Sequence, residues 1–228
     1  MVQFFTKSDT LLDGLYECLY QSNIDIESMK ILEPSAGEGD IIINSLDDSL
    51  FKNITLCEID KKLIDKLYSL CNGCHIINDD FLKHTFNTKF DLIVGNPPFT
   101  FTTEFIIKCF QLLNDNGWFI FIVPDNTLKL TSNIAILQQM DQSGVFYRII
   151  KYSDEQLFEG ANVPVIIFSY HKTKAINRKC LYSVNNKKPD EIEYVINPIF
   201  AFKQSSSSVT IKDLFSVHVG YVSGADKI

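Results

Sequence analysis

The sequence carries no excess of positive charge and no long apolar run. It contains 21 Lys and Arg against 28 Asp and Glu, which gives a net charge of −7. Nucleic acid phosphates are bound mainly by Lys and Arg, so contact with nucleic acid depends on local basic segments, here His171–Lys179 and Lys187–Lys188. No apolar stretch approaches the roughly 20 residues of a membrane-spanning helix. The longest strand-sized run is Trp118–Val123, and we expect no membrane partner.

A secretory signal peptide and an extracellular cysteine framework are also missing. The N-terminus has no signal-peptide pattern, and the six cysteines are typical of reduced thiols in an intracellular, cytoplasmic protein. Cys71, Cys74 and His75 have the spacing of a haem-attachment motif, but neither an export signal nor a second metal-ligand pair accompanies them. We therefore expect no haem and no metal.

Strands alternate with helices along the chain, which predicts an α/β fold. Apolar residues recur at helical spacing in four segments: Thr10–Gln21, Asp40–Ser45, Lys61–Leu70 and Thr103–Leu113. Strand-length apolar runs occur at Met29–Leu32, Ile54–Cys57, His75–Asn78, Phe90–Val94 and Trp118–Val123. Two antiparallel hairpins are predicted from Val145–Lys151 with Val163–Tyr170, and from Leu181–Val184 with Glu191–Ile196. Residues 114–117 predict a turn.

The most informative segment consists of Asn96, Pro97, Pro98 and Phe99, directly after the strand predicted at Phe90–Val94. Two consecutive prolines exclude a helix at the residues before them, so the segment is an extended loop at the carboxyl end of a buried strand. Open α/β sheets bind their ligands there. The Asn96 side-chain oxygen and the Pro97 carbonyl offer two acceptors, and Phe99 offers an apolar ring. This combination fits a planar base with an exocyclic amine.

A second loop follows the first predicted strand. Its residues are Glu33, Pro34, Ser35, Ala36, Gly37, Glu38 and Gly39. The two glycines permit a tight turn and close approach of a ligand to the backbone. The loop matches neither the GxGxxG fingerprint nor a phosphate loop, so it supports neither dinucleotide nor ATP binding. It fits a ligand without phosphates whose positive charge Glu33 matches.

Acidic residues follow the next two predicted strands. Glu58 stands about 20 positions after the glycine turn, where such a residue accepts ribose hydroxyls. Asp60, by contrast, is placed to cap the following helix. Asp80 follows the third strand and can accept a hydrogen bond from an adenine amine, while Phe81 can cover one face of the ring. These residues predict one nucleoside-type site along one edge of the sheet.

In this order the motifs resemble those of the S-adenosylmethionine-dependent N6-adenine DNA methyltransferases with gamma-type motif order, in which the cofactor motif precedes the catalytic one. The resemblance runs through residues 33–39, 57–60, 79–82 and 95–99 and covers nearly the whole chain. It implies a Rossmann-like methyltransferase fold, with a mostly parallel seven-stranded sheet, an antiparallel hairpin strand and helices on both faces. It also implies S-adenosyl-L-methionine as cofactor and, as in restriction-modification systems, methylation of a flipped adenine in duplex DNA.

The resemblance assigns roles residue by residue. Catalysis falls to Asn96, Pro97, Pro98 and Phe99, and stacking on the flipped base to Phe99 and Phe158. Cofactor binding falls to Thr6, Glu33, Pro34, Ser35, Ala36, Gly37, Glu58, Ile59, Asp80, Phe81 and Asn96. Thr6 departs from the family pattern in one respect, because Lys7 stands where the family usually has Pro.

The resemblance also implies a division of the chain. Residues 1–200 form the cofactor-binding catalytic domain. Residues 201–228, which include the serine-rich segment Gln204–Ser208, form a linker and the start of a truncated target-recognition region. We therefore expect DNA specificity to come from a separate recognition subunit, a second copy of the chain or additional sequence.

The sequence leaves three alternative functions open. RNA base-amine methyltransferases share the chemistry and are separated only by substrate. Protein glutamine methyltransferases also use Asn-Pro-Pro-aromatic, since a side-chain amide presents the same NH2, although their cofactor motif usually begins with Asp. A catalytically inactive subunit that binds cofactor for a partner is the third, and the intact Asn96 and Glu58 argue against it.

Overall fold

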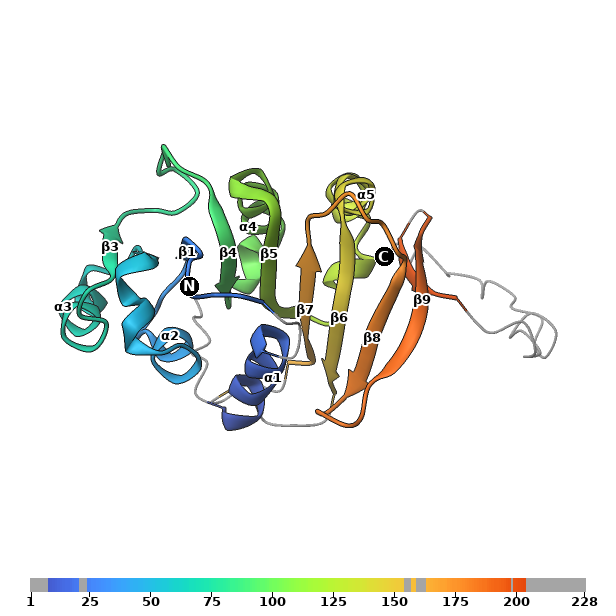
Figure 1. The fold of residues 1–228 in the computed structure, drawn as a ribbon, viewed down its shortest axis with the longest axis horizontal. Helices are drawn as coiled ribbons and strands as arrows, with labels where there is room; N and C mark the ends of the chain where they lie inside the picture. Colours follow the sequence, from blue (N-terminus) through green and yellow to red (C-terminus); the bar gives the residue numbers. More distant parts are fainter. Residues whose placement is uncertain (1–7, 21–23, 154–156, 159–162, 198, 204–228) are drawn as a thin grey trace, which may run out of the picture.

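The computed structural model describes residues 8–20, 24–153, 157–158, 163–197 and 199–203. Within them a single ten-stranded sheet has the order β10-β9-β8-β6-β7-β5-β4-β1-β2-β3. Figure 1 shows this sheet extending across the molecule from β3 at one side to β9 at the other. The architecture is the expected α/β fold, with the first five strands parallel and helices packed on the sheet.

Five parallel strands form the first half of the sheet. They are β1 (Ile31–Glu33), β2 (Ile54–Glu58), β3 (His75–Asn78), β4 (Phe90–Gly95) and β5 (Leu113–Pro124). The central strands are apolar along their length because helices cover both faces. The parallel half of the sheet begins with β1; the chain adds β2 and β3 on one side of it and then returns to place β4 on the other side. This reversal puts the loops after β1 and β4 side by side, where open α/β sheets bind ligands.

The second half of the sheet is mostly antiparallel. Its strands are β6 (Val145–Tyr152), β7 (Val165–His171), β8 (Lys179–Val184), β9 (Asp190–Ile196) and β10 (Phe200–Phe202). Strand β7 lies between β5 and β6 and runs antiparallel to both, so the first predicted hairpin is confirmed. The antiparallel pairing of β8 with β9 confirms the second. Strands β8 to β10 extend the expected seven strands to ten.

Helices cover the two faces of the sheet in separate groups. The α-helices are α1 (Asp9–Tyr20), α2 (Asp40–Ser45), α3 (Lys61–Leu70), α4 (Thr102–Leu112) and α5 (Ile134–Ser143). Side chains of α1, α2 and α3 belong to one buried cluster, and those of α4 and α5 to the other. The first four agree with the predicted helices to within one residue. Helix α5 was not predicted, because only Ile136, Leu137 and Met140 form its buried stripe.

Short 3-10 helices connect these elements: η1 (Asp48–Asn53), η2 (Phe99–Phe101), η3 (Thr127–Lys129) and η4 (Thr131–Asn133). Among the described residues, none of the helices combines the length and the apolar character that crossing a membrane requires. Nor do three or more His, Cys, Asp or Glu side chains gather there as metal ligands would.

The predicted turn at residues 114–117 is placed differently from expectation, since it lies inside β5. Asn116 has a positive φ of 62°, and the pairing of β4 with β5 shifts register between Phe90 and Leu92. The segment stays paired to the end of β7, because Asn116 N donates to Lys172 O at 2.8 Å and Lys172 N donates to Gly117 O at 3.0 Å. The turn residues therefore form an irregularity in a longer strand.

Strand β10 continues the sheet beyond residue 200, where the sequence suggested that the catalytic domain ends. Phe202 pairs with Tyr194 of β9, so residues 200–202 belong to the sheet. The predicted linker Gln204–Ser208 and the remainder of the chain to Ile228 lie outside the described residues.

Helix α1 is held on the sheet by polar contacts as well as apolar packing. The Arg148 guanidinium of β6, buried beneath the helix, forms an ion pair with Glu17. The Asn186 side-chain amide, from the β8–β9 turn, donates to the Thr10 carbonyl at 3.1 Å. The Tyr152 hydroxyl at the end of β6 contacts the same carbonyl at 3.3 Å. The contacts of Asn186 and Tyr152 fix the start of α1 to the carboxyl ends of β6 and β8, and the Arg148–Glu17 pair holds its second half.

Gly14 allows this close packing. A Cβ atom at position 14 would overlap the Tyr152 hydroxyl and lie 2.8 Å from Ile167 Cδ1. Glycine is otherwise unfavourable inside a helix, where alanine is better by roughly 1 kcal/mol. The close approach of β6 and β7 therefore accounts for a glycine at this position.

Gly14→Ala is expected to lower the free energy of unfolding, by about 1–3 kcal/mol, since overlap in a packed core outweighs the gain in helix propensity. Urea denaturation followed by circular dichroism measures the change. Asp13→Ala, on the exposed side of the same helix, is the control and should change stability by less than about 0.5 kcal/mol. A Gly14→Ala protein as stable as the wild type would show that α1 does not pack against Tyr152 in this way.

Candidate functional site

A cavity of about 380 Å³ opens at the carboxyl edge of the parallel strands. We call it the edge cavity, and its size lies in the range of small-molecule sites. Its lining comes from the loops after β1, β2 and β3 and from the segment after β4. The residues that line it are Pro34, Ser35, Cys57, Glu58, Ile59, Asp79, Asp80, Phe81, Leu82, Lys83, Pro98, Phe101 and Phe105.

The glycine turn after β1 is held against the end of β2. Gly37 and Gly39 both have positive φ, 58° and 87°, which confirms the tight turn expected from the sequence. Ala36 N donates to the Cys57 carbonyl at 3.0 Å. Helix α2 begins immediately after Gly39. The turn therefore brings Pro34 and Ser35 into the lining of the edge cavity.

Glu58 is the acceptor that fixes this turn. Its carboxylate is 3 % exposed and accepts a hydrogen bond from Gly37 N at 2.7 Å and another from Asp60 N at 2.8 Å. The side chain lines the edge cavity, where it was expected to meet a ribose. Asp60 caps α3 by accepting from Lys62 N at 2.9 Å, as the sequence predicted.

Glu33 lies behind the turn, outside the cavity lining. Its carboxyl group is buried, and within the described residues no hydrogen-bond partner reaches Oε2. Burial raises the pKa of Glu33 well above its ordinary value, and the nearby Cys71, Glu58 and Asp40 act in the same direction. A buried carboxyl group with these neighbours is poised to gain from a cation placed close to it.

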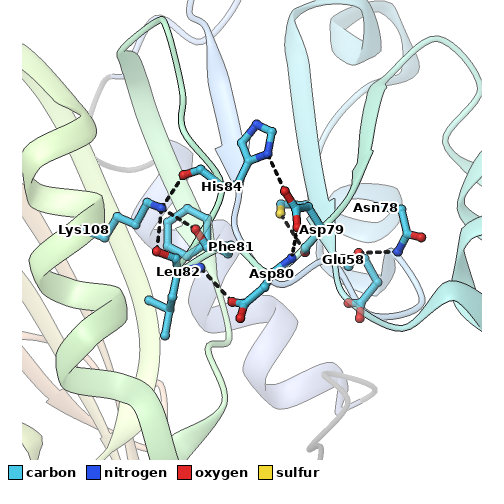
Figure 2. A network of polar contacts seen from close by, with 9 residues as sticks. Glu58, Asn78, Asp79, Asp80, Phe81, Leu82, His84 and Lys108 are labelled. Atoms are coloured by element: carbon cyan, nitrogen blue, oxygen red, sulfur yellow. Dashed lines mark hydrogen bonds and ion pairs between the residues drawn. The ribbon is translucent and has the colours of Figure 1, made fainter.

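The loop after β3 carries the second group of cavity residues. Asp80 Oδ1 accepts from Leu82 N at 3.0 Å, and Asp80 Oδ2 pairs with Lys83 Nζ at 3.0 Å. Asp79 Oδ2 lies 2.9 Å from His84 Nδ1, and this hydrogen bond lowers the pKa of Asp79. Figure 2 shows the Asp80–Leu82 and Asp79–His84 contacts together with Glu58 and Lys108. The loop is therefore ordered by its own carboxylates.

Phe81 follows Asp80 and packs into the core beneath the cavity. Its ring is 3 % exposed and lies 4.9 Å from the ring of Phe105, centroid to centroid. Phe105 belongs to α4, one helical turn beyond Phe101. Three aromatic rings thus face the cavity from two different elements, which suits a flat ring as ligand.

The Asn-Pro-Pro-Phe loop leaves β4 beside the glycine turn. Ser35 Oγ donates to the Asn96 carbonyl at 3.1 Å and so joins the two loops directly. The loop is extended through Pro98, as predicted from its prolines, and then enters η2 and α4. Pro98 lines the edge cavity, whereas Asn96 and Pro97 lie beside it.

Phe99 and Phe158 are brought together by the fold although they are 59 positions apart in the sequence. Their ring centroids lie 5.8 Å apart with the planes at 82°, an edge-to-face contact. Both rings belong to the apolar cluster on the face covered by α1. A base can lie between the two rings only if they move apart.

Seven of the residues expected at the site line the cavity: Pro34, Ser35, Glu58, Ile59, Asp80, Phe81 and Pro98. Glu33, Ala36, Gly37, Asn96, Pro97 and Phe99 are adjacent to it in the chain but absent from the lining. Thr6 lies outside the described residues. The predicted residues from β1, β2, β3 and β4 thus converge on one edge.

Six lining residues were not expected from the sequence: Cys57, Asp79, Leu82, Lys83, Phe101 and Phe105. Asp79, Leu82 and Lys83 adjoin the predicted Asp80 and Phe81, and the end of β3 marks their segment. Phe101 and Phe105 are spaced as one face of a helix that starts just after the proline loop, and that spacing was a usable signal.

Comparison with known families places the chain. A family model described as ribosomal RNA adenine dimethylase matches residues 2–139, more than half of the sequence. The chain belongs to the ribosomal RNA adenine dimethylase family. The matched range contains the glycine turn, Glu58, the Asp80–Phe81 loop and the Asn-Pro-Pro-Phe loop. The resemblance to S-adenosylmethionine-dependent methyltransferases is thereby confirmed, and S-adenosylmethionine is the cofactor.

Two curated relatives extend the similarity beyond the family model. The type II methyltransferase M.HincII of Haemophilus influenzae is 26% identical over 216 residues, covering 81% of this chain and 41% of the relative. The type II methyltransferase M.CvrRI of Paramecium bursaria Chlorella virus XZ-6E is 30% identical over 194 residues, covering 74% of this chain and 48% of the relative. The chain therefore spans less than half the length of either relative.

The fold is found among solved structures. A structure from Listeria monocytogenes, described as a class I S-adenosylmethionine-dependent methyltransferase, has a TM-score of 0.66 at 16% sequence identity. The match covers 82% of this chain and 68% of the other. This similarity confirms the Rossmann-like methyltransferase fold expected from the motifs.

Glu58→Gln is expected to lower the free energy of unfolding, by roughly 1.5–3 kcal/mol. The amide keeps one acceptor oxygen, so one of the two donors, Gly37 N or Asp60 N, faces an NH2 group and loses its hydrogen bond. Thermal and urea denaturation without ligand measure the loss. Glu38→Gln is the control, because its pairing with Lys66 at 2.7 Å is partly exposed and should contribute only about 0–1 kcal/mol. Equal stability of Glu58→Gln and wild type would show that Glu58 does not hold the turn.

Proposed function

We propose that this chain transfers a methyl group from S-adenosylmethionine to the N6 amine of an adenine in DNA. The observation that carries the proposal is the direct contact of the two loops. Ser35 Oγ, from the cofactor turn, donates to the carbonyl of Asn96 at 3.1 Å. The acceptors of the Asn-Pro-Pro-Phe loop therefore stand next to a cavity that suits a nucleoside.

The residues of the edge cavity fit this cofactor. Glu58 still has acceptor capacity on a carboxylate that faces the cavity, and it is assigned the ribose hydroxyls. Asp80 is assigned the adenine amine, and Phe81, Phe101 and Phe105 supply apolar surface for the ring. The bound cofactor would supply an electrophilic methyl group on a sulfonium. Glu33 is assigned to balance the positive charge of this sulfonium.

The Asn-Pro-Pro-Phe loop is assigned the target amine. The N6 lone pair of adenine is delocalised into the ring, so the amine is a poor nucleophile. Asn96 Oδ1 and the Pro97 carbonyl would accept its two hydrogens and favour a tetrahedral nitrogen, whose lone pair then points toward the cofactor side of the loop. Positioning and fixed dipoles supply the catalysis in this scheme.

A target adenine inside a duplex must leave the base stack, at a cost of a few kcal/mol. Phe99 and Phe158 are assigned to stack on the flipped base and offset part of this cost. Since the two rings contact each other edge to face, binding of a base between them requires that the rings separate. Phe158→Ala should thus affect target binding more than cofactor binding.

An RNA adenine is the second candidate substrate. The family match supports it, because the model is described as ribosomal RNA adenine dimethylase. The motif order and the similarity to two type II methyltransferases support DNA. The chemistry at N6 is the same in both, so the substrate assay separates them.

Recognition of a particular sequence is assigned to surfaces beyond the edge cavity. The net charge of −7 leaves few basic side chains for a long phosphate footprint. The chain also spans less than half the length of the two curated relatives. A separate recognition subunit, a second copy of the chain or further sequence would supply the missing contacts.

Asn96→Ala should lower methyl transfer by about 10²–10³-fold, since one of two preorganised acceptors is lost. The assay measures transfer of a labelled methyl group to duplex DNA, single-stranded DNA and RNA, with digestion to nucleosides to identify N6-methyladenine. Cofactor affinity, measured by calorimetry, should stay within about three-fold of wild type. Wild-type activity in the variant would remove Asn96 from the mechanism, and product on RNA alone would favour the second candidate.

Cofactor binding should release a proton from Glu33. Burial raises the pKa of Glu33, so the free protein holds this proton at pH values where an ordinary carboxyl group is ionised. A cation nearby favours the carboxylate, so affinity should increase as pH rises toward the raised pKa and level off above it. Calorimetry in buffers of different ionisation enthalpy counts the released protons. Glu33→Gln, which cannot titrate, should release none from this position; an unchanged proton count would contradict the assignment.

A further inference from the structure

Lys108 of α4 holds the loop after β3 through three backbone carbonyls. Its ammonium donates to Phe81 O at 2.5 Å, to Leu82 O at 3.1 Å and to His84 O at 2.6 Å. Figure 2 shows these three bonds converging on one nitrogen. A lysine ammonium has three donor hydrogens, so the three carbonyls use all of them. Lys108 is therefore bound to the loop as tightly as its chemistry permits.

Aromatic rings surround the same ammonium. It lies 5.0 Å from the centroid of the Phe81 ring and 5.7 Å from that of Phe86, both within cation–π distance. Burial lowers the pKa of Lys108 from its ordinary value, while Cys57, Cys109 and then Asp80 and Asp79 of the loop act in the opposite direction. The ammonium is therefore partly desolvated where it holds the loop.

The position of Lys108 links the two walls of the edge cavity. One wall is α4 and the turn before it, which supply Phe101 and Phe105. The opposite wall is the loop that supplies Asp80, Phe81 and Leu82. Lys108 follows Phe105 by three residues on α4 and is absent from the cavity lining. It spans the walls from behind without facing the ligand space.

We propose that Lys108 is a positioning residue that fixes the distance between these walls and so sets the affinity for the adenosine part of the cofactor. The inference rests on the proposed function, because it takes the edge cavity as the adenosine site. Removal of the ammonium leaves three carbonyls without their shared donor, and the loop loses its polar attachment to α4, keeping the packing of Phe81 on Phe105. Binding of the adenosine must then order the loop against α4, and the free energy of this ordering weakens the affinity.

Lys108→Met tests this role, since methionine fills similar space and cannot donate. The dissociation constants of S-adenosylmethionine and of adenosine alone should both rise about ten-fold or more, while kcat at saturating cofactor stays within about three-fold of wild type. A residue with a purely structural role would lower stability without this selective effect on binding. Lys108→Arg keeps the charge but spreads its donors over a plane, and should recover only part of the affinity.

Lys172→Met is the matched control. The Lys172 ammonium also donates to a backbone carbonyl, that of Leu113 at 3.1 Å, and lies 5.2 Å from the Phe110 ring. It contacts the far end of α4, away from the edge cavity. Its substitution should lower stability by less than Lys108→Met does, because one carbonyl instead of three loses its donor, and should change cofactor affinity by less than about two-fold.

A measurement on the wild-type protein covers the case in which Lys108→Met fails to fold. Amine acylation followed by mass spectrometry should label Lys83, whose side chain is 83% exposed, at least about ten-fold faster than Lys108, whose ammonium is held by three carbonyls. Equal labelling of the two lysines would overturn the inference.

The outcomes separate the inference from the proposed function. If the wild type binds S-adenosylmethionine and Lys108→Met binds it equally well, the positioning role of Lys108 is wrong and the proposed function is unaffected. If the wild type binds neither S-adenosylmethionine nor adenosine, the proposed function is wrong, and so is the role of Lys108 that depends on it. A selective loss of affinity in Lys108→Met, absent from Lys172→Met, supports both.

Discussion

The Glu58 carboxylate is the contact on which the arrangement of the site depends. It accepts from Gly37 N in the glycine turn, 21 positions earlier in the chain, and from Asp60 N at the start of α3, so one side chain fixes two loops. A buried carboxylate with two backbone donors is stable because both donors would otherwise lack partners. The turn then holds the Asn-Pro-Pro-Phe loop through Ser35. The position of the proposed catalytic acceptors, in the Asn-Pro-Pro-Phe loop, thus depends on Glu58, the residue assigned to the cofactor ribose.

The edge cavity combines a polar side with an apolar side. Glu58 and Asp80 supply acceptors, while Phe81, Phe101 and Phe105 supply aromatic surface. The polar side is fixed by backbone hydrogen bonds, and on the apolar side Phe81 and Phe105 pack into the cluster under α4 and α5. Lys108 joins the two by holding the Phe81 loop against α4. A ligand that needs both sides, such as a nucleoside, meets walls that are already placed.

The second half of the sheet holds α1 in place. Arg148 and Tyr152 of β6 and Asn186 after β8 attach α1 to the sheet. The helix in turn covers the apolar cluster that contains Phe99 and Phe158. The turn after β8 therefore matters for the site although β8 lies far from the edge cavity in the strand order. It supports the face on which the target base is proposed to bind.

The local sequence predicted four of the five α-helices and the order of the site residues along the chain. Apolar periodicity predicted α2, α3 and β3 with the bounds observed, because their ends coincide with Gly39, the Asp60 cap and polar turns. The two prolines determined the extended loop after β4, since a fixed φ is a property of the residue itself. The motif residues at successive strand ends placed Glu58, Asp80 and Pro98 at one edge, as the structure has them.

The groups that pack against these edge residues could be identified from the tertiary structure and not from the sequence. Lys108 has no motif around it, and its three carbonyl partners come from a loop 24 to 27 positions earlier. The contact of Phe99 with Phe158 and the need for glycine at position 14 likewise arise from elements that meet only in the folded chain. Sequence patterns report short-range preferences, whereas these contacts depend on the strand order, which is set by packing over the whole sheet. The sequence determined which residues stand at the edge, and the packing of α4 against the loop after β3 determined the cavity between them.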